Sequence, residues 1–183
     1  MITVALLLLV VAGLTTALIA TEEDPPSSFR STSQKDCSLI TGTDSTKELR
    51  RIVPRAQSFS VSVLQSTGNA IPLLTCEVRA DDRLAVKLTV ISTSDDQQEW
   101  AEEITKTDLA QPSDRHRVKL YGGGFTGPHA ATLYVPCSAS GAGRQHALDV
   151  KAIARRGTDH EKDLLKLARR AAKHATGTLG CEK

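Results

Sequence analysis

The chain has 183 residues, of which 24% are charged and 40% hydrophobic, a composition typical of a globular protein rather than a disordered one. Aromatic residues make up only 3%, which excludes an aromatic platform for stacking single-stranded nucleic acid. The formal net charge of +2 is too small for a dedicated polyanion binder, so we expect no nucleic-acid partner. The length beyond the first 20 residues is that of one domain.

The first 20 residues form an apolar block. Residues 2–20 read ITVALLLLVVAGLTTALIA, without charge or proline, and a helix of about 20 residues spans a hydrocarbon core of about 30 Å. A helix in a soluble core would show a polar face, so we expect a single-pass transmembrane helix that holds the protein at the cell membrane. The alternative is a signal peptide cleaved after Ala17 or Ala20, although the basic segment that usually precedes one is missing. A lipoprotein anchor is excluded because the first cysteine is Cys37.

The four cysteines are spread along the rest of the chain, at Cys37, Cys76, Cys137 and Cys181, without a C-x-x-C pair. An even number of widely spaced cysteines favours two disulfides in an oxidising compartment. The rivals are a zinc site, which usually draws ligands from close pairs, and reduced buried thiols. Three pairings are possible, and we favour Cys37–Cys76 with Cys137–Cys181, which join neighbours in the sequence. Residues 37–183 are therefore expected to form an extracytoplasmic, disulfide-stabilised domain.

The segment between the apolar block and the domain is polar. Residues 21–36 read TEEDPPSSFRSTSQKD. This segment is rich in proline and serine, and we expect it to form a flexible stalk. Residues 44–53 then predict a short helix with Asp44 or Ser45 as its cap, and Pro54 would stop it.

From residue 58 onward, apolar residues recur with a period of two. Residues 58–63 predict a strand, and residues 74–78 and 84–90 predict a hairpin that turns at residues 80–82. Further strands are predicted at residues 116–121, 131–136 and 146–154. Residues 94–108 fit either a helix capped by Ser94 and Gln97 or an irregular segment.

The last element is an amphipathic helix over residues 161–175, opened by a capping box from Thr158 to Glu161. Its apolar face comprises Leu164, Leu165, Ala168, Ala171, Ala172 and Ala175. Its other face carries five cations, Lys162, Lys166, Arg169, Arg170 and Lys173. These could contact lipid headgroups or an anionic wall polymer, although a solvated helix face is the simpler interpretation. The expected fold class is α+β, with mostly antiparallel strands and this C-terminal helix.

No sequence motif identifies a reaction. Gly122, Gly124 and Gly127 match a dinucleotide fingerprint by letter, but a strand rather than a helix is predicted to follow, so we interpret the glycines as permitting positive φ in a tight loop. The chain has no G-x-S-x-G, H-E-x-x-H or G-K-[ST] motif, and its histidines show no metal-ligand spacing. We therefore predict no catalytic residues, no metal ligands and no cofactor.

Three segments carry a resemblance to a family. They are LLTCEVRADDRLAVKLTV at residues 73–90, YGGGFTGPHAATLYVPC at residues 121–137 and LLKLARRAAKHATGTLGC at residues 164–181. Together with the N-terminal apolar helix, they make the chain resemble an uncharacterised family of small actinobacterial proteins that are membrane-anchored or secreted and have four cysteines. The resemblance implies no activity and no site residues.

Two functional hypotheses follow. The first is a non-enzymatic surface module that binds an unknown protein or a cell-envelope component, as the anchor, stalk and disulfides suggest. The alternative is a small secreted envelope enzyme, a hydrolase, whose site residues the sequence does not identify. A pocket that gathers two or more histidines or carboxylates would favour the enzyme.

Overall fold

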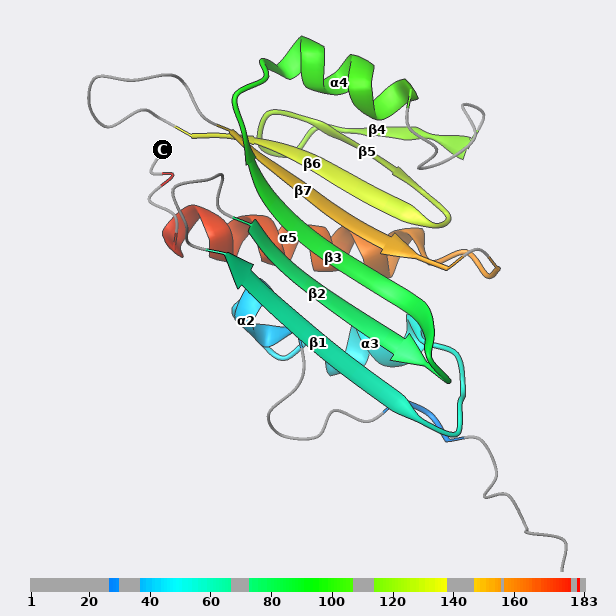
Figure 1. Ribbon diagram of the computed structural model, residues 1–183. Helices are drawn as coiled ribbons and strands as arrows, with labels where there is room; N and C mark the ends of the chain where they lie inside the picture. The colour runs from blue at the N-terminus through cyan, green and yellow to red at the C-terminus, as the bar shows by residue number, and fades with distance from the viewer. Residues whose placement is uncertain are drawn as a thin grey trace, which may run out of the picture.

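The computed structural model describes residues 27–29, 37–66, 73–106, 114–137, 147–155, 157–178 and 181. Within these residues, seven strands form one antiparallel sheet in the order β1-β2-β3-β7-β6-β5-β4 (Figure 1). The strands are β1 (Phe59–Ser66), β2 (Leu73–Ala80), β3 (Arg83–Thr93), β4 (His116–Val118), β5 (Gly124–Gly127), β6 (Ala130–Pro136) and β7 (Ala147–Ala154). The helices are α2 (Ser38–Thr41), α3 (Thr46–Ile52), α4 (Gln97–Lys106) and α5 (Glu161–Thr178). The expected α+β class, with mostly antiparallel strands and a C-terminal helix, is confirmed.

The first three strands and the last four form the two halves of the sheet, and the two halves join at its centre. β1 to β3 run inward from one edge and β4 to β7 from the other, and β3 pairs with β7 so that Val90 lies opposite Val150. The strands expected at residues 58–63, 131–136 and 146–154 are present, but the one expected at residues 116–121 ends at Val118. Sequence periodicity does not reveal β5, because this strand has four residues and two of them are glycines.

The β2–β3 hairpin turns where the sequence predicts. Ala80 pairs with Arg83, and the two residues between them, Asp81 and Asp82, have φ of 47° and 60°. Two successive positive φ values define a type I′ turn, whose twist matches that of the flanking strands. The Asp81 carboxylate also accepts hydrogen bonds from the backbone N–H groups of Gln57 and Ser58, at 2.9 and 3.0 Å, so the turn also holds the chain that enters β1.

Helix α5 covers one face of the sheet, with α2 and α3 beside it (Figure 1). Four alanines on α5, which have no bulk beyond Cβ, bring its axis close to the strands; they are Ala168, Ala171, Ala172 and Ala175. Leu164 and Leu167 complete the buried face, whereas Leu165, which we expected there, is only half-buried. The helix begins at Glu161, whose N–H donates to the Asp159 carboxylate at 2.9 Å, and it continues through Gly177 to Thr178, beyond the expected end.

Both disulfides lie on this covered face. Cys37, just before α2, bonds to Cys76 in β2, with their Cα atoms 5.7 Å apart. Cys137, just after β6, bonds to Cys181 beyond α5, with their Cα atoms 4.4 Å apart. The favoured pairing is therefore confirmed. Two disulfides are typical of an oxidising compartment, and they indicate an extracytoplasmic domain.

Helix α4 covers part of the opposite face. Residues 94–108 therefore hold a helix, but its cap is Asp96 and not Ser94: the Asp96 carboxylate accepts the N–H groups of Gln98 and Glu99 at 2.8 and 2.9 Å. On its inner side, Trp100 and Ile104 pack with Tyr134 and the rest of a small separate core. Within the described part of the chain, no helix covers the strands β1 to β3 on this face (Figure 1).

The N-terminal predictions fall mostly outside the described residues. The expected transmembrane or signal helix at residues 1–20 lies there entirely, and among the residues that are described no helix is long and apolar enough to cross a membrane. Of the expected stalk, residues 27–29 are described: Ser27 pairs with Ala56, and Phe29 is 1% exposed with its ring 5.5 Å from that of Phe59. The stalk prediction therefore does not extend to these three residues.

Candidate functional site

A groove lies between α4 and the turn that joins β4 to β5. Its cavity measures about 420 Å³, within the usual range for small-molecule sites. One wall is the inner side of α4, with Gln97, Trp100 and Ala101, and the other is formed by residues 117–119 and 121–125. We call this cavity the α4–β4 groove.

Glycines form the second wall because side chains do not fit there. A Cβ at Gly122 would lie 2.7 Å from the Tyr134 ring, and one at Gly124 would collide with the Thr132 carbonyl oxygen. Gly123 has a φ of 115°, which L-residues rarely adopt. Gly122, Gly124 and Gly127 were expected to have a positive φ in a loop, but none of them does, and Gly124 and Gly127 belong to β5; the glycine with the positive φ is Gly123.

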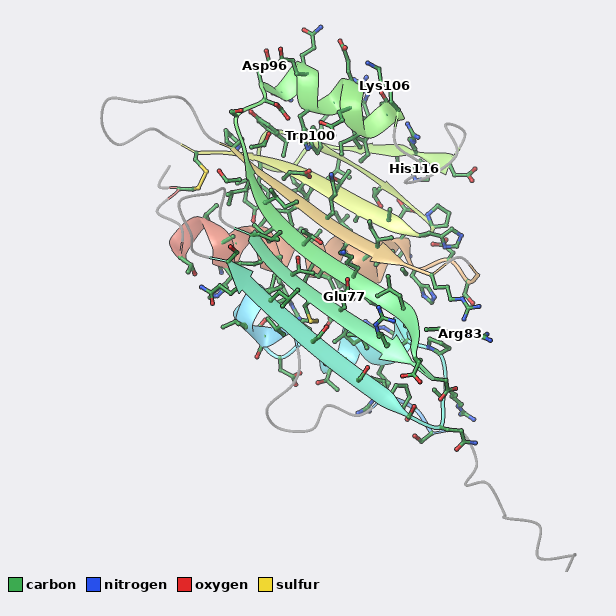
Figure 2. All side chains as sticks on the ribbon, in the orientation of Figure 1. Glu77, Arg83, Asp96, Trp100, Lys106 and His116 are labelled. Atoms are coloured by element: carbon green, nitrogen blue, oxygen red, sulfur yellow. A yellow bond between two sulfur atoms is a disulfide. The ribbon has the colours of Figure 1, made fainter. Side chains whose placement is uncertain are left out.

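The aromatic rings of Trp100 and Phe125 line the groove, and Tyr134 packs beside Trp100 outside the lining. The Trp100 ring lies 6.1 Å from that of Phe125, nearly parallel, and 5.4 Å from that of Tyr134 (Figure 2). The Tyr134 hydroxyl donates to the Asp95 carbonyl at 2.9 Å, which ties β6 to the segment before α4. Burial raises the pKa of Tyr134, and the nearby carboxylates of Asp96 and Asp95 act in the same direction, so the phenol stays protonated at neutral pH.

A second group of polar residues gathers at the N-terminal end of α5. Glu161 Oε1 lies 2.9 Å from His116 Nδ1 and accepts a hydrogen bond from the Thr126 hydroxyl at 3.1 Å. The hydrogen bond to Glu161 raises the pKa of His116, whose side chain is 66% exposed. Burial lowers the pKa of the neighbouring His160. His116 lies at the surface whereas Thr126 is buried, and among the described residues no three His, Cys, Asp or Glu side chains are placed to hold a metal ion.

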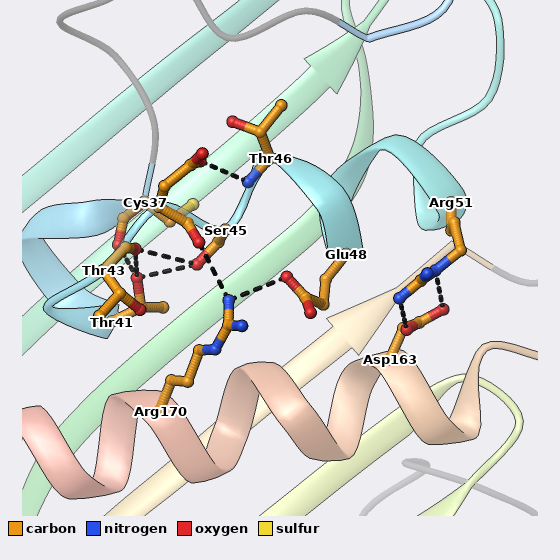
Figure 3. A network of polar contacts seen from close by, with 10 residues as sticks. Cys37, Thr41, Thr43, Ser45, Thr46, Glu48, Arg51, Asp163 and Arg170 are labelled. Atoms are coloured by element: carbon orange, nitrogen blue, oxygen red, sulfur yellow. Dashed lines mark hydrogen bonds and ion pairs between the residues drawn. The ribbon is translucent and has the colours of Figure 1, made fainter.

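The five cations of α5 have different environments. Arg170 is bound within the protein: its guanidinium donates to the Glu48 carboxylate at 2.9 Å and to the Asp44 carbonyl at 3.0 Å (Figure 3). The Glu48 side chain is only 4% exposed, so this ion pair fastens α5 to α3. The other four, Lys162, Lys166, Arg169 and Lys173, are exposed. The anion-contacting face expected from the sequence therefore has four available cations rather than five.

One of the exposed cations also lines a second cavity. Arg169 and Thr176 of α5, together with Tyr121 and Cys181, border a space of about 490 Å³ on the covered side of the sheet. The Tyr121 hydroxyl lies 3.5 Å from the Arg169 carbonyl oxygen. Tyr121 also lines the α4–β4 groove, so the β4–β5 turn separates the two cavities.

The sequence did not identify the α4–β4 groove as a site. Its residues come from two segments more than fifteen positions apart, and neither carries a motif that predicts a binding groove. The one available signal was the YGGG run beside the basic strand of Arg117 and Lys119, because consecutive glycines often mark a close backbone approach.

No protein-family model matches the chain, and neither a curated protein nor a solved structure shows significant similarity to it. The resemblance to small actinobacterial proteins therefore stays an expectation, and the function must be argued from the residues themselves.

Proposed function

We propose that this protein is a non-enzymatic binding module of the cell envelope, and that the α4–β4 groove is where it binds. The observation that carries the proposal is the groove itself, which combines an apolar base with exposed cations on one rim and lies on a rigid sheet. Binding sites are typically concave and apolar with a few polar groups that orient the ligand. The partner is a protein or an envelope component of unknown identity.

The anchor is the second part of the proposal. Residues 2–20 hold the domain at the cell membrane as a single-pass helix, with the C-terminal domain outside the cytoplasm; secretion after signal cleavage is the alternative. Intact-mass spectrometry without reduction, on membrane and culture-medium fractions, tests this directly. In the membrane fraction we expect the mass of the full-length chain. That mass should be lower than the fully reduced mass by four hydrogen atoms, because each disulfide removes two. A species in the medium that begins after Ala17 or Ala20 would show that the protein is secreted and not anchored.

Site-specific photo-crosslinking tests the binding role. A photoreactive residue at Gln97 faces the groove, whereas one at Ser60 lies on the uncovered part of the sheet and one at Lys166 lies on the exposed face of α5. In intact cells we expect one recurrent adduct from position 97 and none from position 60. Adducts from position 166 alone would move the binding surface to the cations of α5, and an absence of adducts at all three positions would contradict a binding module.

One observation favours the alternative, a small secreted hydrolase. The Glu161 carboxylate bridges His116 and Thr126, and such a contact can orient a histidine as a general base. The wide exposure of His116 weighs against it, because a site open to water does not strengthen electrostatic interactions. Ester hydrolysis by the purified protein that is lost in His116→Gln would establish the enzyme over the binding module.

A further inference from the structure

The indole N–H of Trp100 is a buried donor without an acceptor. Trp100 is 2% exposed and lines the α4–β4 groove, yet its Nε1 has no hydrogen-bond partner among the described residues. Leaving such a donor unpaired costs about 1–3 kcal/mol, and buried tryptophans usually satisfy theirs. The unpaired donor therefore belongs to a side chain that lines the groove.

Two cations stand at the rim of the same groove. Val118 packs against the core under α5, so the alternation of β4 turns Arg117 toward the α4 side, where it lies opposite Phe125. Lys119, just after β4, lines the same groove. Both are exposed, and neither forms an ion pair within the described part of the chain. By contrast, Lys87 and Lys151, which lie on the same face of the sheet, are paired with Glu77 and Asp149 at 3.1 and 2.6 Å.

The chemistry of these groups defines the complementary ligand. An indole N–H, a guanidinium and an ammonium group all donate hydrogen bonds and accept none. A ligand that matches them is rich in acceptors and negatively charged. Ala101 and Phe125 line the cavity between the donors, so the ligand also needs a compact apolar part.

We infer that the α4–β4 groove binds a small organic anion, a carboxylate or phosphate ester on a compact apolar body. Its charged group lies between Arg117 and Lys119, and one of its acceptor atoms takes the Trp100 N–H. The inference rests on the proposed function, since it names the class of ligand for the same groove.

The protein contains its own reporter, because Trp100 is its only tryptophan. Titration of the full chain, with emission excited at the red edge of indole absorption, reports on the groove alone. The probes are cyclohexanecarboxylate and cyclohexyl phosphate, with neutral cyclohexylmethanol and inorganic phosphate as controls. We expect saturable emission changes with one or both organic anions in the micromolar to millimolar range, and weaker binding of the two controls. The better of the two anions identifies the charged group.

Charge variants test the rim. Arg117→Gln and Lys119→Gln should each weaken binding of the anion about fivefold, the upper range for an exposed ion pair. Lys106→Gln is the matched control, since it removes the same charge from the last turn of α4, outside the groove, and should leave the affinity unchanged. An equal loss in Lys106→Gln would mean a nonspecific charge effect and would overturn the inference.

The indole donor is tested by calorimetry, which needs no tryptophan. Trp100→Phe keeps an aromatic ring but removes the N–H, and we expect three- to tenfold weaker binding. Tyr134→Phe removes a hydroxyl from the same aromatic cluster that is bonded to Asp95 outside the groove, and should bind normally. If the neutral alcohol binds as tightly as the anions, the inference that the ligand is an anion is wrong, although the proposal that the groove binds a ligand stands. If none of the four probes binds and position 97 gives no crosslinks, both the inferred anionic ligand and the proposed binding role of the groove are wrong.

Discussion

The two faces of the sheet are built differently. The face under α5 is one continuous apolar core, closed by two disulfides and by an ion pair between Arg170 and the buried Glu48. The opposite face is polar over much of its area, and α4 contributes only a small separate core around Trp100. On the second face, the indole donor of Trp100 and the cations Arg117 and Lys119 have no hydrogen-bond or ion-pair partner, respectively, within the described residues.

This difference separates stability from binding. Removing a group from the face under α5 leaves a cavity or an unpaired charge in the main core, so global stability should fall. Removing a group from the α4 side should lower mainly the local stability around α4, because few apolar contacts elsewhere in the domain depend on that side.

The largest effect is expected from the disulfides of the covered face. The Cys37→Ala/Cys76→Ala double variant opens a loop of 39 residues and should lower the free energy of unfolding by about 4 kcal/mol in the chain-entropy model. Urea denaturation measures this loss. The native emission of Trp100 should stay the same, because the bond lies on the other face. A shifted native spectrum would show that the two faces are coupled.

The next effect concerns the ion pair under α5. Arg170→Met leaves the Glu48 carboxylate buried without its partner and should cost about 3 kcal/mol by urea denaturation. Arg51→Met is the matched control: it breaks the more exposed pair with Asp163 and should cost less than about 1 kcal/mol. Adding Glu48→Leu to Arg170→Met should recover stability. Similar losses in the two single variants would mean that Arg170 belongs to a solvated face after all.

A smaller and local effect is expected on the α4 side. Asp96→Ala removes the cap of α4 and should destabilise the helix by about 1 kcal/mol. Hydrogen exchange should then speed up at the amides of α4 and stay the same in α5. Glu103→Ala, an exposed change on α4, serves as the control and should alter neither. Faster exchange in both helices would mean that the sheet has one cooperative core instead of two.

The smallest effect depends on pH and lies where β4 meets α5. Contact with Glu161 raises the pKa of His116 above its ordinary value of 6.5, so protonated His116 stabilises the fold. Its contribution is fully present below about pH 6.5 and is lost as the pH rises through the raised pKa. His116→Gln should therefore lower the Tm at pH 5.5 and leave it nearly unchanged at pH 9. Glu161→Gln should abolish this pH dependence, and a difference that grows with pH would contradict the contact.

The part of the fold that follows from local sequence was predictable. Period-two alternation identified the longer strands, and the 3.6-residue period and the capping-box pattern identified α5, although the side chain that caps the helix is Asp159 and not Thr158. The disulfide pairing followed from proximity in sequence. The two-aspartate turn was predictable because aspartate tolerates a positive φ better than most residues, and here the Asp81 side chain also accepts hydrogen bonds from backbone N–H groups.

What escaped prediction depends on contacts between distant segments. Arg170 looked like the other cations of α5, and only the fold shows that Glu48, 122 positions away, binds it. The cap of α4 fell on Asp96 because Trp100 and Ile104 must face the sheet, which sets the register of the helix. The α4–β4 groove arises where two segments without motifs meet, so no pattern in either segment could reveal it.

The arrangement of the disulfides also decides how the domain carries a mechanical load. A pull between Cys37 and Cys181 passes through Cys76 and Cys137, so the covalent path bypasses the loops of 39 and 44 residues that contain α2, α3 and α5. At about 3.4 Å per extended residue, the closed bonds remove about 280 Å from the length to which the chain can be stretched. Under tension, the strands between Cys76 and Cys137 would extend, including the walls of the groove, while the helices of the covered face stay off the loaded path.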